Sequence, residues 1–199
     1  MLKWRARFLQ VGLVISLLGQ ACSPSTDAVK IRPLLVEPGD LVFRVGTGWR
    51  SEMVRARGNF ALSHVGIADR LSNGDIVVIH ANPGEGSRKG SVRAEPFSSF
   101  ASPSQTRGLA IYRLRLSQTS KIHMLAKAWS YVDQQRPFDS DYNLSDENAL
   151  YCTELVWRAM GEQHIPRFTS NVPLLNSQII LPEDLLKSVN NEKLIQHTN

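Results

Sequence analysis

The sequence predicts an α+β domain in which an antiparallel sheet of about five strands, open or closed into a barrel, comes before the main helices. Two observations indicate this class. The first half carries short apolar runs separated by turns that contain glycine and proline, which is typical of strands. The second half carries apolar residues at helical spacing. A chain of 199 residues with 42% hydrophobic residues is long enough for one such domain with a packed core.

Residues 1–22 are expected to be a secretory signal peptide of the lipoprotein type. A positively charged start is followed by an apolar stretch over residues 11–18, which is too short to span a membrane comfortably. The residues around Cys22 resemble a bacterial lipoprotein cleavage site, although Gly19 stands where such sites usually carry leucine or a similar residue. A lipidated Cys22 and a polar tether over residues 23–35 would hold the domain at a membrane face. Plain cleavage, which would give a soluble periplasmic protein, is the alternative.

A single folded domain is expected over residues 36–190, and its strands come first. A Pro-Gly turn at 38–39 precedes the first strand, and residues 46–60 are expected to form a loop and a short helix. The Asn-Gly pair at 73–74 is the strongest short-range hairpin signal in the chain. The strands are expected within residues 36–44, 62–68, 76–81, 92–97 and 109–114.

Helices dominate the second half of the predicted domain. Apolar residues three and four positions apart indicate them, and a serine or proline marks the start of some. They are expected over residues 121–134 with Ser120 as the N-cap, from Cys152 to about Gly161, and from Pro182 onward. Residues 191–199 are expected to be a polar, frayed tail.

Cys152 is the only cysteine left once the predicted signal peptide is set aside. A thiol in the first turn of a helix lies near backbone N–H groups and near the positive end of the helix dipole. Both favour the thiolate, which is the nucleophilic form. A lone cysteine is also a common small buried hydrophobe, so this residue alone leaves both interpretations open.

Two histidines lie on the predicted hairpin. If Asn73 and Gly74 form its loop, His64 and His80 lie far from the turn, at the same end of neighbouring strands. Strand alternation could place both side chains on one face. The alternative is that both are surface histidines or satisfied core histidines.

These residues together match the needs of nucleophilic cysteine chemistry, which requires a thiol, a base, a group that orients the base and donors for the oxyanion. Cys152 could be the nucleophile and His64 the base. His80 sits where an orienting group belongs, one strand over. The backbone N–H of Cys152 and the hydroxyl of Tyr151 are candidate oxyanion donors.

Four short motifs follow one another in a particular order: PGDLVFR at 38–44, SHVGIA at 63–68, VIHA at 78–81 and YCTELV at 151–156. In this order they resemble the circularly permuted papain-like hydrolases of the NlpC superfamily, the YiiX/YebB-like group, in which the strands precede the cysteine helix. The resemblance covers roughly residues 36–160. It implies a permuted papain-like α+β domain with Cys152 as nucleophile and His64 as base.

His80 departs from the pattern of many members of that group, which carry an acidic third residue at this place. Ordinary NlpC enzymes and the related lecithin retinol acyltransferase-like proteins often use histidine there. A neutral histidine can accept the N–H of His64 but lends no full negative charge. We therefore expect the imidazolium form of His64 to be less stabilised than it would be beside a carboxylate.

The predicted function is that of an exported thiol hydrolase that cleaves an amide bond. Its substrate would be a peptidoglycan peptide (a muropeptide), another peptide or a lipid-linked amide. A lipid acyltransferase or thioesterase on the same fold and a non-catalytic binding module are the alternatives. The predicted location is the bacterial periplasm or, through Cys22, the membrane of the cell envelope.

Cofactors and nucleic acid are not expected as partners. The five histidines are spread along the chain without the spacing of metal ligands. The net charge of +5 includes three positive residues of the predicted signal peptide, and no dense run of Lys and Arg with interleaved aromatic residues is present.

Overall fold

A computed structural model describes residues 35–57, 61–84, 89–161, 171–172, 177–188 and 191–198. The predicted signal peptide, Cys22 and all but the last residue of the predicted tether lie outside the described residues. No helix among the described segments combines the length and the hydropathy that crossing a membrane requires.

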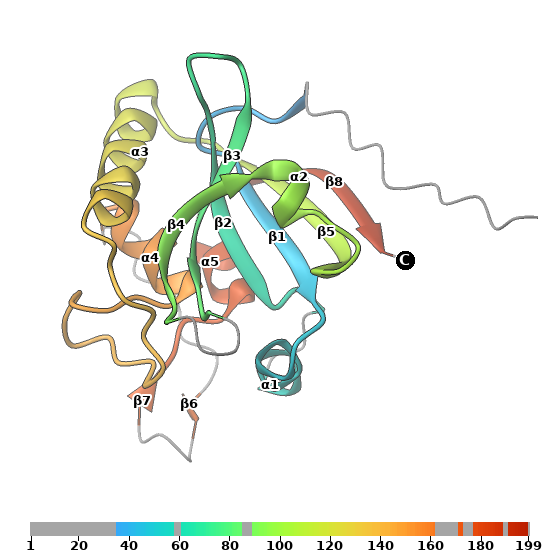
Figure 1. Cartoon of the computed structure of the whole chain (residues 1–199), viewed down its shortest axis with the longest axis vertical. Helices are drawn as coiled ribbons and strands as arrows, with labels where there is room; N and C mark the ends of the chain where they lie inside the picture. Colours follow the sequence, from blue (N-terminus) through green and yellow to red (C-terminus); the bar gives the residue numbers. More distant parts are fainter. Residues whose placement is uncertain are drawn as a thin grey trace, which may run out of the picture.

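The centre of the fold is a six-stranded antiparallel sheet, which is open rather than closed into a barrel (Figure 1). Its strand order is β4-β3-β2-β1-β5-β8. All five predicted strands are present, and consecutive strands β1 to β4 lie side by side. The strands are β1 (Leu41–Gly46), β2 (His64–Arg70), β3 (Ile76–Asn82), β4 (Ser91–Pro96), β5 (Thr106–Leu114) and β8 (Asn191–Thr198).

Strand β8 is a departure from the predicted polar tail. It pairs with β5 along its whole length, from Gly108 opposite Thr198 to Leu114 opposite Asn191. The segment carries only two adjacent apolar residues, so its sequence has no strand alternation to read. The strand forms because the open edge of β5 offers unpaired backbone groups, a condition that only the assembled sheet reveals.

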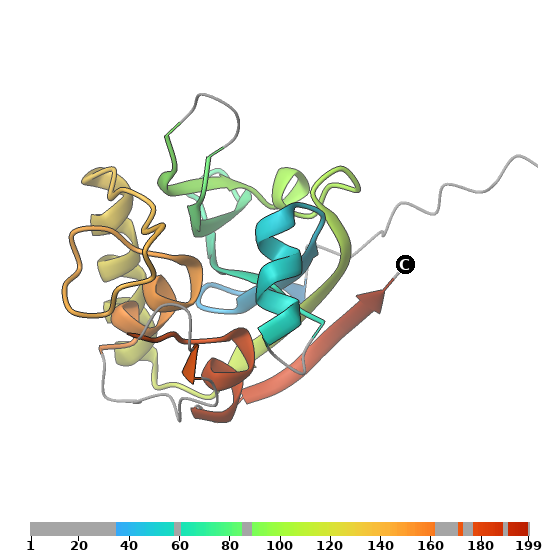
Figure 2. The same cartoon turned by 90° about the horizontal axis from the view of Figure 1, so that it is seen from below.

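Both faces of the sheet are covered, which explains why the strands read as continuous apolar runs. Residues of one face pack with helices α3 (Gln118–Asp133), α4 (Cys152–Ala159) and α5 (Pro182–Ser188) in the larger core cluster. Residues of the other face pack with the short helix α2 (Phe97–Phe100) in a second cluster. Figures 1 and 2 show α3 and α4 together on one side of the sheet. The remaining elements are α1 (Trp49–Arg57) and a small ladder of β6 (Asn171–Val172) and β7 (Ser177–Gln178).

Helix α3 begins three residues earlier than the sequence predicts. Its N-cap is Ser117, which has extended backbone and whose hydroxyl accepts the N–H of Ser120 at 3.1 Å. Both serines have the chemistry of a cap, but Ser120 already lies inside the first turn. The predicted cap at Ser120 is therefore wrong, although it correctly marks where the helix starts to within a turn.

Candidate active site

Helix α4 brings Cys152 to one end of the sheet. Cys152 is its first residue, and Leu155, Val156 and Ala159 are buried in the larger core cluster, as the helical spacing predicts. The helix packs on β2 and β3. A backbone hydrogen bond from Val65 reaches the Cys152 thiol, so the thiol lies beside the residue that follows His64 in β2.

The residues on either side of Cys152 hold a distant segment in place. The Tyr151 hydroxyl accepts the backbone N–H of Ile180 at 2.9 Å, and the Thr153 hydroxyl donates to the Ile180 carbonyl at 2.6 Å. Both contacts are buried. The Tyr151 hydroxyl thus has a packing role, while its ring also lines the cavity in front of Cys152.

His64 and His80 lie at the same end of the predicted hairpin and on one face of the sheet, although the loop spans residues 71–75 rather than the Asn73-Gly74 pair alone. His64 Nε2 and His80 Nδ1 are 2.8 Å apart, and both side chains are buried. The register that pairs Ile67 with Ile79 sets Gly66 opposite His80, so the two histidines are diagonal neighbours on one face. A Cβ on Gly66 would lie 2.4 Å from a Val78 methyl and 3.0 Å from the His80 Cβ. The missing side chain at position 66 therefore permits the approach of the two rings.

A carboxylate with no distinctive signal in the sequence, Glu95, lies next to the histidine pair. Glu95 Oε1, on β4, lies 3.2 Å from His80 Nε2, although the ring N–H is not ideally aligned with that oxygen. Glu95 also lies 3.6 Å from Arg93 and 4.0 Å from Arg44. Its alternation with Val92 and Ala94 could have placed it on the histidine face. Only the pairing of β3 with β4, which sets Val78 opposite Glu95, brings it to His80.

The ring of Phe100 covers the histidine pair. It stacks on His64 with ring centroids 5.7 Å apart and contacts His80 edge-on at 5.1 Å. The Arg44 guanidinium also lies over the Phe100 ring, 4.5 Å from its centroid. Phe100 comes from α2, so the second core cluster shields the histidines from water.

Burial and nearby charges keep both histidines neutral. Burial lowers the pKa of His64 well below 6.5, and the positive charges of Arg44 and Arg93 add to this effect. Burial also lowers the pKa of His80, and Glu95 opposes that shift without cancelling it. For Glu95 itself, burial would raise the pKa, but the contacts with His80 and the two arginines outweigh it and lower the pKa. The site therefore holds two neutral imidazoles and one carboxylate at neutral pH.

The Cys152 thiol differs from the expectation of a thiolate. Burial raises its pKa to about 11, against an ordinary value of 9.0, and the backbone hydrogen bonds from Val65 and the first helical turn recover only part of that shift. The residue as a whole is only partly buried, but the thiol group lies where water solvates it poorly. The backbone hydrogen bonds at the helix start do lower the thiol pKa, as predicted, but desolvation raises it by more. The resting pair is thus a thiol beside a neutral imidazole.

Two adjoining cavities lie at this end of the sheet. The first, of about 80 Å³, contains both Cys152 and His64 on its wall. Its other walls are mainly apolar: Val54, Pro83, Phe138, Tyr142, Tyr151, Ile179, Ile180, Leu181 and Pro182. His80 does not line this cavity and stands behind His64.

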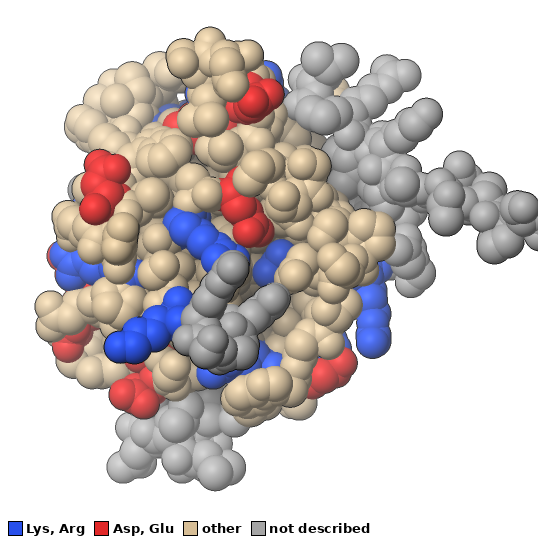
Figure 3. Space-filling view, viewed as in Figure 1, with Lys and Arg blue, Asp and Glu red and all other residues tan. Residues whose placement is uncertain are grey.

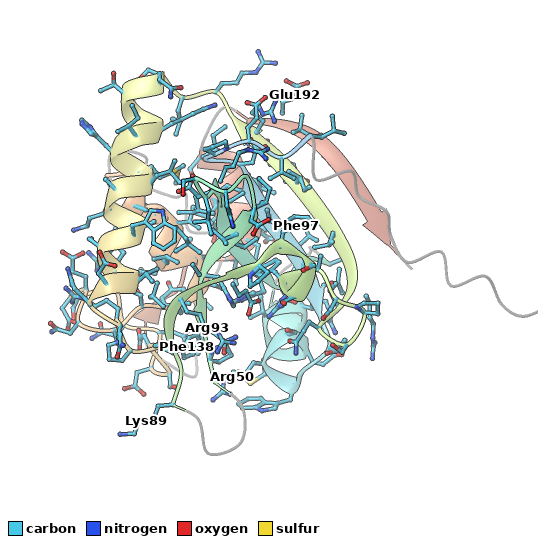
Figure 4. The ribbon with its side chains drawn as sticks, turned by 45° about the horizontal axis from the view of Figure 1, so that its top comes forward. Arg50, Lys89, Arg93, Phe97, Phe138 and Glu192 are labelled. Carbon is cyan, nitrogen blue, oxygen red and sulfur yellow. The ribbon has the colours of Figure 1, made fainter. Side chains whose placement is uncertain are left out.

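The second cavity, of about 350 Å³, is polar. It shares Arg44, Arg50, Ser51 and Pro83 with the first, so the two cavities lie side by side. The face drawn in Figure 3 has a concentration of Lys and Arg near its middle. Figure 4 shows Arg50 and Phe138 at the lower end of the sheet, and the Arg50 guanidinium lies 6.0 Å from the Phe138 ring centroid.

A buried ion pair fixes the loop that leads into α4. Arg158 binds Glu154 one turn earlier at 2.9 Å and donates to the carbonyls of Leu144 and Asp146. Burial raises the pKa of Glu154 to about 7, against the opposing effect of Arg158. Glu154 therefore faces Arg158 and the loop rather than the thiol.

The strand-first α+β fold, with a cysteine at a helix start and a histidine on a neighbouring strand in one cavity, defines the class of permuted papain-like cysteine hydrolases. The family model described as "Permuted papain-like amidase enzyme, YaeF/YiiX, C92 family" matches residues 35–195. The chain belongs to this family, and it is an enzyme of the cysteine amidase type. A search of curated proteins found no match.

A solved structure supports the fold assignment. The chain is similar to YiiX from Escherichia coli O157:H7, with a TM-score of 0.60 over 82% of this chain and 98% of that chain. The two sequences are 14% identical, so this likeness concerns the fold alone. That protein is described as a metalloprotein. Among the described residues of this chain, no group of three or more His, Cys, Asp or Glu side chains is arranged to hold a metal ion.

Proposed function

We propose that this protein is an exported thiol amidase that hydrolyses a peptide-type amide through Cys152, His64 and His80. The observation that carries the proposal is the shared cavity: Cys152 and His64 line it together, and the far nitrogen of His64 is held by His80 at 2.8 Å. That arrangement leaves Nδ1 of His64 as the nitrogen available to a thiol.

The reaction follows from a neutral starting pair. His64 Nδ1 accepts the thiol proton as the Cys152 sulfur attacks the substrate carbonyl, and the carbonyl electrons form an oxyanion. The backbone N–H of Cys152 and the Tyr151 hydroxyl are the proposed oxyanion donors. His64 then returns the proton to the amine as the C–N bond breaks. A water molecule, deprotonated by His64, cleaves the resulting thioester and releases the acid and the thiol.

The two cavities favour a peptide with an anionic group over a lipid amide. The small apolar cavity at Cys152 suits a short apolar side chain next to the scissile bond. The polar cavity adjoins it, and Arg50 stands on the wall between them. Among the described residues Arg50 forms no ion pair, so its charge is available to a substrate carboxylate. A muropeptide, which carries free carboxylates, has this combination.

The test is cleavage of defined amides by the purified protein. We expect muropeptides to yield a new amino group and two fragments by mass spectrometry, with no product from Cys152→Ser. Replacement of Arg50 by Gln should raise KM for a peptide with a free carboxylate and leave KM for the carboxyl-amidated peptide unchanged. A stable thioester on Cys152 after incubation with a lipid would instead indicate acyl transfer. Binding of muropeptides without cleavage would indicate a binding module.

We further propose that the protein is exported and anchored at the cell envelope through Cys22. The support is the positively charged and apolar leader that ends at Cys22 and the polar residues that follow it. Cell fractionation and intact-mass measurement test this proposal. A diacylated N-terminal Cys22 in the membrane fraction, lost in Cys22→Ser, is the expected result. A soluble periplasmic chain with an unmodified N-terminus would refute lipidation, and an uncleaved cytoplasmic chain would refute export.

A further inference from the structure

Three adjacent strands each contribute one ionisable side chain to a single row. His64 lies on β2, His80 on β3 and Glu95 on β4, and each is a diagonal neighbour of the next. Each side chain contacts the next through one pair of atoms. His64 Nε2 lies 2.8 Å from His80 Nδ1, and His80 Nε2 lies 3.2 Å from Glu95 Oε1. The row ends at the carboxylate, because β4 is the edge strand of the sheet.

An ionised carboxylate only accepts hydrogen bonds, so the approach of Glu95 Oε1 to His80 Nε2 at 3.2 Å favours one direction for the whole row, although the ring N–H is not ideally aligned with that oxygen. Glu95 requires the proton of His80 to be on Nε2, which leaves Nδ1 of His80 as an acceptor. His64 must then carry its own proton on Nε2. Its Nδ1 is consequently the nitrogen with a free lone pair. Both rings have lowered pKa values and are neutral, so each holds a single proton, and the position of the proton on one ring determines its position on the other.

We propose that Glu95 is a positioning residue of the amidase, because its carboxylate sets the tautomers of His80 and His64 and so keeps His64 Nδ1 ready to accept the thiol proton. This inference rests on the proposed function for its consequence in catalysis. The acidic group that many related enzymes carry beside the catalytic histidine is thus present here, one strand further away. Without it, His80 could carry its proton on Nδ1, and His64 would then direct an N–H toward Cys152.

The surroundings of the row are consistent with this role. His80 is fully buried, and the Glu95 side chain is only 18% exposed. The charged groups that face the row are Arg44 on β1 and Arg93 on β4, and both keep Glu95 ionised. Phe100 of α2 covers the two histidines and contributes no charge, and Glu95 lines a polar cavity of about 350 Å³. Of these neighbours, only Glu95 carries an acceptor near His80 Nε2, at 3.2 Å.

The test measures the tautomers directly. Long-range proton–nitrogen NMR spectra of the ¹⁵N-histidine-labelled wild-type protein at neutral pH should show Nε2–H on both His64 and His80. In Glu95→Gln, whose amide can donate as well as accept, the two rings should populate Nδ1–H forms. We expect kcat to fall by about 100-fold with KM nearly unchanged, the size of effect typical of impaired base catalysis. Glu192→Gln on β8, which alters an exposed ion pair with Arg115, is the control and should change neither quantity (Figure 4).

Several results would overturn the inference. An Nδ1–H tautomer of His64 in the wild type does so without any variant, even if Glu95→Gln fails to fold. Unchanged tautomers and kcat in a folded Glu95→Gln protein do so as well. Glu95→Asp, which keeps the negative charge, should retain the wild-type tautomers. If both Glu95→Asp and Glu95→Gln lose them, the packing of the Glu95 side chain rather than its charge sets the tautomers, and the inference is wrong. If the wild type cleaves no amide, the proposed function fails, whereas the tautomer measurement still decides the role of Glu95.

Discussion

The pH dependence of Cys152 alkylation depends directly on the ionisation state of the resting site. A thiol with a pKa of about 11 is ionised far less at neutral pH than an ordinary thiol with a pKa of 9.0. Because each pKa unit changes the thiolate fraction tenfold, iodoacetamide should modify Cys152 about 100-fold more slowly at pH 7 than it modifies an ordinary cysteine. The rate should keep rising with pH to beyond pH 10.

The variant His64→Ala distinguishes a neutral thiol–imidazole pair from a thiolate–imidazolium pair. In such a pair, loss of the imidazolium would raise the thiol pKa and slow the reaction at neutral pH. In the neutral pair described here, no imidazolium charge stabilises the thiolate. Removing the ring opens the buried cavity to water, and the thiol pKa should fall toward 9.0. We therefore expect His64→Ala to alkylate faster than the wild type, by at most about 100-fold at pH 7.

The assay follows the Cys152 peptide by mass spectrometry between pH 6 and pH 10.5, in protein carrying Cys22→Ser so that only one thiol reacts. Circular dichroism confirms that both proteins are folded at each pH. A rate plateau that begins below pH 7 and disappears in His64→Ala would refute the reasoning. It would show that the helix start and the imidazole together outweigh desolvation.

Three other predictions follow from the same site. Amide hydrolysis should be constant above pH 6.5 and fall only at lower pH, as His64 protonates through its lowered pKa, and a decline near pH 8 in kcat/KM would contradict this. Gly66→Ala should separate His64 from His80 and lower the free energy of unfolding, measured by urea denaturation, by about 1–3 kcal/mol. Its kcat should also fall under conditions in which the variant is fully folded. Tyr151→Phe should leave the buried Ile180 N–H without an acceptor and cost about 1–3 kcal/mol, and an unchanged melting temperature would show that water replaces the hydroxyl.

The parts of the site that local geometry determines could be predicted from the sequence. The Asn-Gly pair predicts the hairpin of β2 and β3 and so places His64 and His80 at the same end of it, but the register comes from a five-residue loop, residues 71–75, with Arg70 opposite Ile76, and this register puts the two histidines on one face. The helical spacing after Cys152 likewise places that residue at the start of a packed helix. Both predictions rest on short segments in which neighbours in sequence are neighbours in space.

The parts that depend on distant segments could not be predicted in this way. Glu95 reaches His80 only through the pairing of β3 with β4, and nothing in the sequence between the two strands fixes the register of that pairing. The pKa of Cys152 depends on the summed burial by several elements, and a helix-start argument considers one of them. Strand β8 depends on the free edge of β5, which exists only in the folded sheet. Register across long loops and desolvation are thus the terms missing from sequence reasoning.

The two hydrogen bonds that Tyr151 and Thr153 make with the backbone of Ile180, here called the Ile180 clamp, affect how this family member could acquire new substrates. Tyr151 and Thr153 bind only the backbone N–H and carbonyl of Ile180, so the clamp does not depend on which side chain position 180 carries. Ile179, Ile180 and Leu181 form part of the wall of the apolar cavity. Substitutions there could reshape the wall during evolution while the backbone stays tied to both neighbours of Cys152. Selectivity for the group beside the scissile bond could then diverge between relatives without a matching change in the chemistry of bond cleavage.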